Sequence, residues 1–144
     1  MAKRCLLLAG LIAVGLAPVA NAQGVEVEPG LGFVLLDGAV PATDVGAVVW
    51  VRPDLGFAYR FTRAYHTGSD SLAYQAVTVR YRRTYSSNQA VEIGVGWIPA
   101  GAVASEVLGT YRFTRAFALK LGVVFDFNGE TKLVQPAVLA AVGV

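Results

Sequence analysis

The stretch "LGFAYRFTRAYH" (55–66) alternates large apolar side chains with small or polar ones at a period of two residues. One face carries Leu55, Phe57, Tyr59, Phe61 and Tyr65, and the other carries Gly56, Ala58, Arg60, Thr62 and Ala64. Successive side chains of a β-strand point to opposite faces, so this pattern predicts a strand whose two faces meet different surroundings.

The same alternation recurs along the chain, and no window after Gln23 has sustained helical spacing. The predicted strands span 24–36, 45–51, 55–66, 72–85, 90–97, 102–113, 117–126 and 132–144. The predicted breaks are "DGAVPATD", "RPD", "TGSD", "SSN", "PAG", "TRA" and "NGE", which are rich in turn-forming residues. Because proline is unfavourable within a strand, "RPD" is interpreted as a turn. The sequence predicts eight antiparallel strands with short connections.

Residues 1–22 have the pattern of a cleaved secretory signal peptide, which leaves 23–144 as one β-barrel domain. A basic start, the apolar run 5–19 and the small residues "ANA" before Gln23 carry this prediction. Its removal takes away the lone Cys5, together with Lys3 and Arg4, and lowers the formal charge from +2 to zero. The mature chain therefore offers no basic surface for nucleic acid, and we expect no metal site and no cofactor.

Two features indicate that the large apolar face points outward, into lipid. The opposite face is rich in glycine and alanine, which suit the cramped lumen of an eight-stranded barrel. That face also carries charges of both signs, which can pair in a low-dielectric interior. The predicted lumen charge network comprises Glu26, Glu28, Arg60, Arg80, Arg82, Glu92, Glu106, Arg112, Lys120 and Asp126. The prediction is an all-β, eight-stranded, antiparallel up-and-down transmembrane barrel with both termini on the periplasmic side.

The apolar face supplies the aromatic residues expected at the borders of a membrane. The predicted lipid-facing aromatics are Phe57, Tyr59, Phe61, Tyr65, Tyr81, Trp97, Tyr111, Phe113, Phe117 and Phe125. A soluble periplasmic lipid-binding barrel, with these residues in its core, is the alternative architecture.

The segments "LGTYRFTRAFALKLGV" (108–123) and "YRRTYSSNQAVEIGVGW" (81–97) resemble hairpins of the small outer-membrane β-barrel superfamily. The resemblance implies the membrane domain of the outer-membrane protein A-like group, located in the cell outer membrane. Chains of that superfamily usually end in an aromatic residue, whereas this chain ends in Val144. The implied partners are outer-membrane lipids, lipopolysaccharide and the barrel-insertion machinery, with the protein itself monomeric.

The expected function is a non-enzymatic, structural role in the Gram-negative envelope, with porin-like pore activity that is at most weak. Three residues near the third connection, His66, Ser69 and Asp70, form the minority catalytic hypothesis. A hydroxyl near a base can act as a nucleophile, and "YHTGSDSL" is faintly similar to outer-membrane lipid A deacylases. The spacing His-x-x-Ser differs from that family's His-x-Ser, and glycine, serine and aspartate also favour a turn.

Overall fold

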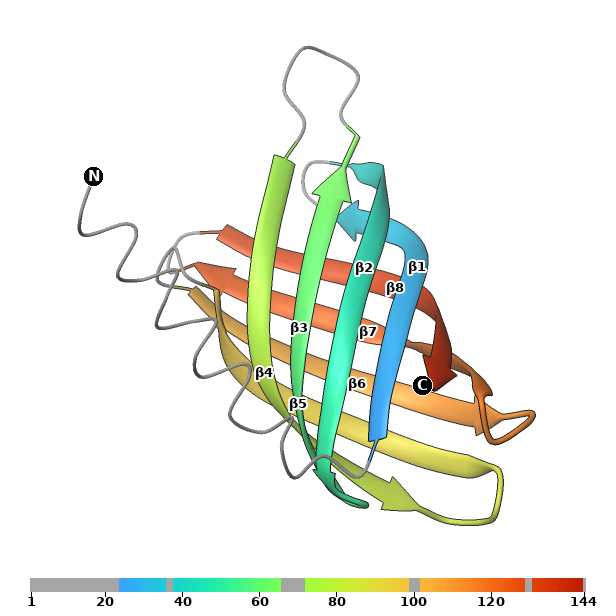
Figure 1. Ribbon diagram of the computed structural model, residues 1–144. Coiled ribbons are helices and arrows are strands. Elements are labelled where there is room, and N and C mark those ends of the chain that lie inside the picture. Colours follow the sequence, from blue (N-terminus) through green and yellow to red (C-terminus); the bar gives the residue numbers. More distant parts are fainter. Residues whose placement is uncertain (1–23, 36–37, 66–71, 99–101, 129–130, 144) are drawn as a thin grey trace, which may run out of the picture.

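The chain forms one closed barrel of antiparallel strands, each paired with its neighbours in sequence and the last with the first (Figure 1). The computed structural model describes residues 24–35, 38–65, 72–98, 102–128 and 131–143. The strands are β1 (Gly24–Leu35), β2 (Ala39–Arg52), β3 (Leu55–Ala64), β4 (Leu72–Thr84), β5 (Gln89–Ile98), β6 (Ala102–Arg112), β7 (Phe117–Asn128) and β8 (Thr131–Gly143). The predicted fold class is therefore confirmed. No helix in the described part of the chain is long and apolar enough to cross a membrane.

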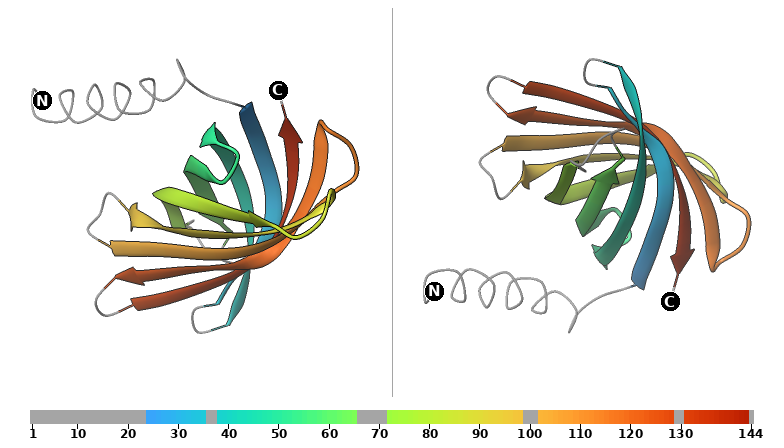
Figure 2. Two further views of the ribbon diagram at one scale, coloured as in Figure 1. Left: turned by 90° about the horizontal axis from the view of Figure 1, so that it is seen from below. Right: turned by 90° about the horizontal axis from the view of Figure 1, so that it is seen from above.

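The period-two alternation separates the two faces of the barrel wall. Along β3 the even-numbered residues from Gly56 to Ala64 are buried, whereas Phe57, Tyr59 and Phe61 are exposed. In Figures 1 and 2 the front strands cross those behind at a steep angle, as expected of strongly tilted strands in a small barrel. Large apolar side chains cover the outside, and the lumen is filled by the other face.

The two ends of the barrel differ in what lies there. At one end, named here the terminal end, β1 begins beside the end of β8, with Glu26 opposite Gly143. The same end holds the connections 53–54, 85–88 and 113–116. Two of these connections are closed by backbone hydrogen bonds, from Tyr85 N to Gln89 O at 2.9 Å and from Phe113 N to Phe117 O at 3.0 Å. The opposite end, where β1 leads to β2, is named the far end.

One predicted break is wrong. The segment "DGAVPATD" was expected to be a connection, but β2 begins at Ala39 and contains Pro41, which pairs with Phe33. Proline lacks one N–H donor, but its carbonyl still bonds, here accepting from Tyr65 N at 2.8 Å. Each strand of a closed barrel has two partners, so one missing donor is tolerated. The predicted turn at "RPD" is confirmed at Pro53 and Asp54.

Candidate functional site

Charged side chains from six strands meet inside the barrel, toward the terminal end. Four carboxylates enter from β1, β5 and β6, and five cations enter from β3, β4, β6 and β7. These residues, the lumen network, are Glu26, Glu28, Glu92, Glu106, Arg60, Arg80, Arg82, Arg112 and Lys120. All nine belong to the set predicted from the sequence. The tenth member of that set is Asp126, whose side chain lies outside the described residues.

Arg80 is the centre of the deeper half of the network. Its Nη1 donates to Glu28 Oε1 at 2.7 Å and to Glu92 Oε2 at 3.1 Å, and its Nε donates to Glu106 Oε1 at 2.7 Å. Arg80 and its three carboxylate partners are almost completely buried. Glu106 is held further by Arg60 Nη2 at 2.7 Å. One planar guanidinium on β4 thus bonds to carboxylates of three other strands, β1, β5 and β6.

Lys120 and Glu26 are the centre of the other half of the network, which lies nearer the terminal end. The ammonium of Lys120 contacts Glu28, Glu26 Oε2 at 2.8 Å and Glu92 Oε2 at 2.9 Å. Glu26 also accepts from Arg82 Nη2 at 2.8 Å and from Arg112 Nη2 at 2.9 Å. Lys120 is fully buried, whereas Arg82 and Arg112 are partly exposed. The buried charges are therefore paired with opposite charges, as a low-dielectric interior requires.

Glycines in the neighbouring strands make room for these long side chains. Gly94 lies between Arg80 and Glu106 in the strand register, and a Cβ on Gly94 would lie within van der Waals overlap of the Glu106 side chain. Gly46 lies in the same way between Glu28 and Arg60. These glycines of the inner face therefore leave the space that the long charged side chains occupy.

Polar residues that were not predicted as part of the network complete the polar lumen. The buried carboxylate of Asp44 accepts from Thr62 Oγ1 and from Gln135 Nε2, both at 2.5 Å. Thr78 donates to Glu106 at 2.9 Å, and Thr110 donates to Glu92 at 3.1 Å. With Asp44 included, five carboxylates and five cations face the described lumen. The alternation along β4 and β6 indicates that Thr78 and Thr110 point inward. Asp44 was missed because it fell within the segment interpreted as a connection.

Trp50 is another inward residue that the sequence analysis did not predict. It is buried, and its ring lies 3.7 Å from Arg82 Cζ and 5.8 Å from Lys120 Nζ. The ring packs over Gly56, where a Cβ would lie 2.8 Å from Trp50 Cε3. The face of an indole attracts cations, so Trp50 both fills space and adds to the binding of Arg82 and Lys120.

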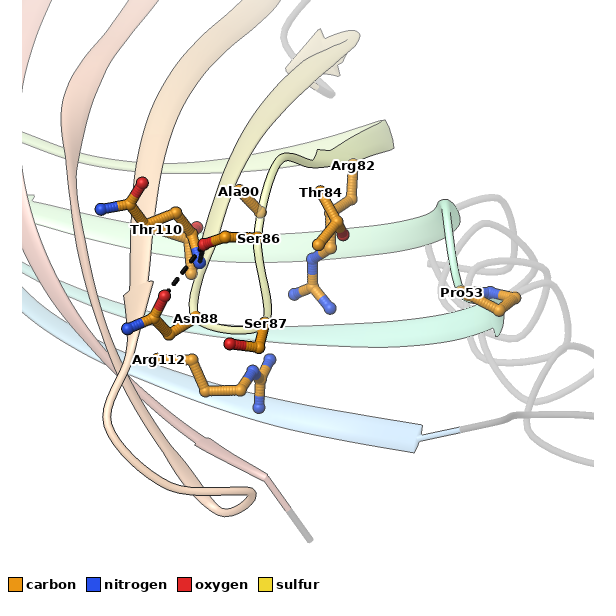
Figure 3. Close-up of a pocket in the computed structure, with 10 residues that line it drawn as sticks. Pro53, Arg82, Thr84, Ser86, Ser87, Asn88, Ala90, Thr110 and Arg112 are labelled. Atoms are coloured by element: carbon orange, nitrogen blue, oxygen red, sulfur yellow. Dashed lines mark hydrogen bonds between the residues drawn. The ribbon is translucent and has the colours of Figure 1, made fainter.

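Above the network, at the terminal end, lies a small polar cavity of about 190 Å³ (Figure 3). The guanidinium groups of Arg82 and Arg112 are in its wall, together with the turn residues Ser86, Ser87 and Asn88. Ser86 Oγ donates to Asn88 Oδ1 at 2.9 Å within that turn. Arg82 and Arg112, which line the cavity, both donate to Glu26, so the cavity adjoins the lumen network.

Toward the far end the lumen is filled by apolar side chains. Val34, Ala42 and Ala64 form one buried cluster, and Ala76, Ile98 and Ala104 form another. Leu108 and Leu139 are fully buried in a further cluster with Ala137, opposite Glu92 and Lys120 in the strand register. An eight-stranded barrel is only wide enough to be filled by its own side chains, and this lumen is filled in that way.

The hypothetical catalytic residues His66, Ser69 and Asp70 lie outside the described residues. Within the described residues, no group of three or more histidine, cysteine, aspartate or glutamate side chains is arranged to hold a metal ion. The described lumen therefore supports an electrostatic role, in which paired charged side chains hold the strands together.

The predicted lipid-facing aromatics point outward. Each is exposed except Phe125, which is half-buried. Phe113 belongs to the 113–116 connection and not to the strand predicted to contain it, and its ring lies 5.0 Å from that of Tyr111 and 5.6 Å from that of Phe117. This group forms an aromatic cluster at the terminal end.

Two matching pairs of arginine and tyrosine mark the borders of the apolar outer surface. Arg63 lies over the ring of Tyr65 at the far end, and Arg83 lies over the ring of Tyr85 at the terminal end. Arg63 is opposite Ala73, ten residues before Arg83 on β4. At a rise of about 3.3 Å per residue and a tilt of about 40–45°, the two levels are about 23–25 Å apart. This matches the apolar band of ~25 Å that membrane barrels present to lipid.

Comparison with solved structures finds the same fold. The chain is similar to the N-terminal β-barrel domain of Pseudomonas aeruginosa OprF, with a TM-score of 0.66, 10% identity and coverage of 85% of this chain and 98% of that one. It is similar to Ail, the attachment invasion locus protein of Yersinia pestis, with a TM-score of 0.61, 10% identity and coverage of 84% and 97%. A chain from the de novo design of transmembrane β-barrels matches with a TM-score of 0.63, 19% identity and coverage of 85% and 97%.

No protein-family model and no curated protein matches the chain. The closed eight-stranded barrel, its apolar exterior and its charged interior define a β-barrel of the outer-membrane type.

Proposed function

We propose that the protein is a non-enzymatic β-barrel of the bacterial outer membrane that contributes to envelope integrity and keeps its own lumen closed. The observation that carries this proposal is the lumen network, in which Arg80 on β4 and Lys120 on β7 bond to the same two carboxylates, Glu28 on β1 and Glu92 on β5. Removing either cation would take a hydrogen-bonded partner away from three buried carboxylates, so the closed arrangement is favoured. The apolar clusters of the far end add a second obstruction.

The first test is membrane insertion. The mature chain, refolded in detergent or lipid vesicles, is expected to migrate differently on a gel before and after boiling, because a closed membrane barrel resists detergent until heated. The expected result in the source bacterium is recovery in the outer-membrane fraction. A chain that is monomeric in buffer without detergent and is recovered in the periplasm would refute the membrane assignment.

The second test is conductance in a planar lipid bilayer. The refolded wild-type protein is expected to give no porin-sized current steps, because paired side chains fill its lumen. Shortening Lys120 to alanine removes the ammonium that joins Glu26, Glu28 and Glu92 and is expected to raise the frequency of small current steps. Large, stable steps from the wild-type protein would contradict the closed-lumen proposal.

A further inference from the structure

The outer wall of the barrel has an apolar groove that the lumen network does not explain. Its volume is about 690 Å³, within the ~300–1,000 Å³ range typical of small-molecule pockets. Its lining residues come from β7, β8, β1 and β2 and from Tyr65 after β3. These four strands are consecutive neighbours in the closed sheet, where they can be followed in Figure 2. The residues that line it are Leu31, Gly32, Phe33, Pro41, Ala42, Thr43, Tyr65, Leu121, Gly122, Pro136, Ala137 and Val138.

The groove exists because the wall is thin at this level. The strand register places Ala42, Gly32, Ala137 and Gly122 side by side on β2, β1, β8 and β7, with their side-chain positions toward the lumen. They nevertheless line the groove, so its floor is backbone and Cβ atoms. The sides are outward-pointing apolar residues, among them Leu31, which is 66% exposed.

Two prolines lower the number of main-chain N–H donors at the groove. Pro41 on β2 and Pro136 on β8 both line the groove, and proline has no N–H. An unpaired N–H facing hydrocarbon would be costly, so two prolines in this position suit an apolar occupant. Pro41 lies in the segment that the sequence analysis interpreted as a connection, whereas Pro136 lies within a predicted strand.

The far-end rim of the groove is polar and carries one positive charge. Thr43 Oγ1 and Tyr65 Oη are 3.2 Å apart, and both residues line the groove. Arg63 is opposite Thr43 in the register, and its Cζ lies 5.5 Å from the centroid of the Tyr65 ring. Among the described residues, Arg63 has this ring contact and no ion pair within 4.0 Å. An exposed guanidinium beside a hydroxyl pair is a good donor set for a phosphate.

We propose that this groove binds a lipid A-type glycolipid, with an acyl chain on the apolar floor and a phosphate at Arg63. The inference rests on the proposed outer-membrane location. An even strand number puts the start of β1 and the end of β8 at the same end of the barrel. In outer-membrane barrels that end, with its short turns, is periplasmic, so the rim at the far end faces the outer leaflet. That leaflet is where phosphorylated, multiply acylated glycolipid is found. The apolar volume and the adjacent charge complement the two parts of such a molecule.

The experiment is native mass spectrometry of the refolded full mature chain in detergent, titrated with purified lipid A. Thr43→Phe fills the groove from outside, and Arg63→Gln removes the rim charge. Each has a matched control: Val45→Phe adds the same bulk two residues further along β2, outside the groove, and Arg83→Gln removes the equivalent arginine at the terminal end. We expect one retained lipid A on the wild type, a loss of about tenfold in apparent affinity for Thr43→Phe and for Arg63→Gln, and no change for either control.

Phosphatidylglycerol and phosphatidylethanolamine are titrated as separate arms. Equal retention of phosphatidylglycerol would assign the groove to an ordinary phospholipid and overturn the proposal. A protein dimer that Thr43→Phe abolishes would assign it to a second copy of the chain. Equal effects of Thr43→Phe and Val45→Phe would show that lipid binds the outer surface without using the groove. The gel shift on boiling is measured for every variant, so failure to form a barrel is distinguished from failure to bind lipid.

Discussion

Replacing Arg80 with leucine is expected to lower the free energy of unfolding of the barrel by about 3–5 kcal/mol. Arg80 is 1% exposed and bonds to Glu28, Glu92 and Glu106. The substitution leaves buried carboxylates without this partner, and breaking a buried pair from one side costs more than the pair contributes. Unfolding is measured by titrating the protein in lipid vesicles with urea and monitoring tryptophan fluorescence.

Two further variants make this result interpretable. Arg83→Leu, on the same strand but on the outer face, is expected to change stability by no more than about 0.5 kcal/mol. Arg80→Lys keeps the charge but lacks the planar fork that reaches three carboxylates, so it is expected to lie between the wild type and Arg80→Leu. If Arg80→Leu does not fold at all, Arg80→Lys supplies the measurable loss. Equal stability of Arg80→Leu and Arg83→Leu would contradict the central role of Arg80.

The lumen network was largely predictable from the sequence because side-chain direction along a strand depends on residue parity. Arg80 and Glu92 fall on the small-residue face of their strands, and the structure places both inside the barrel. The partners of each residue did not follow from parity. Arg80 and Glu28 are 52 residues apart in sequence and meet across the lumen, which depends on how the closed sheet is staggered.

The prediction was wrong where it relied on residue composition instead of on the alternation of odd and even positions along a strand. Proline, threonine and aspartate in "DGAVPATD" predicted a connection, yet Ala42 and Asp44 continue the inward positions of β2. Trp50 was missed for the opposite reason. The segment "VGAVVWV" is apolar at nearly every position, so nothing in it shows which side faces the lumen, and the residue opposite, Gly56, makes the space for the ring.

Glycine is the residue whose role the sequence conceals most, and Gly96→Ala is expected to have the second large effect. A Cβ on Gly96 would lie deep within the van der Waals radii of Val77 O and 2.6 Å from Thr78 Cα, both in the backbone of β4. Backbone cannot rotate away as a side chain can, so β4 and β5 must separate. In a closed barrel that separation strains the hydrogen bonds between all the strands. We therefore expect the free energy of unfolding to fall by about 3 kcal/mol, or the chain to form no barrel whose gel migration changes on boiling.

Gly109→Ala is the matched control, since Gly109 is also within a strand. The nearest atom to a Cβ at Gly109 is Leu121 O at 3.7 Å, which is ordinary van der Waals contact. Adding a methyl group there is expected to change stability by no more than about 0.5 kcal/mol, with a small gain from the lower backbone entropy of the unfolded chain. Both variants are measured by the urea titration and by the gel shift on boiling.

The two variants together test why Gly96 is a glycine. If both glycines tolerate alanine equally, the close approach of β4 and β5 at Gly96 is not what stabilises this side of the barrel. If only Gly96→Ala fails, this glycine is required by the approach of two backbones, and the inner face contains two kinds of glycine: those that accommodate long charged side chains, such as Gly94, and those that let strands come together.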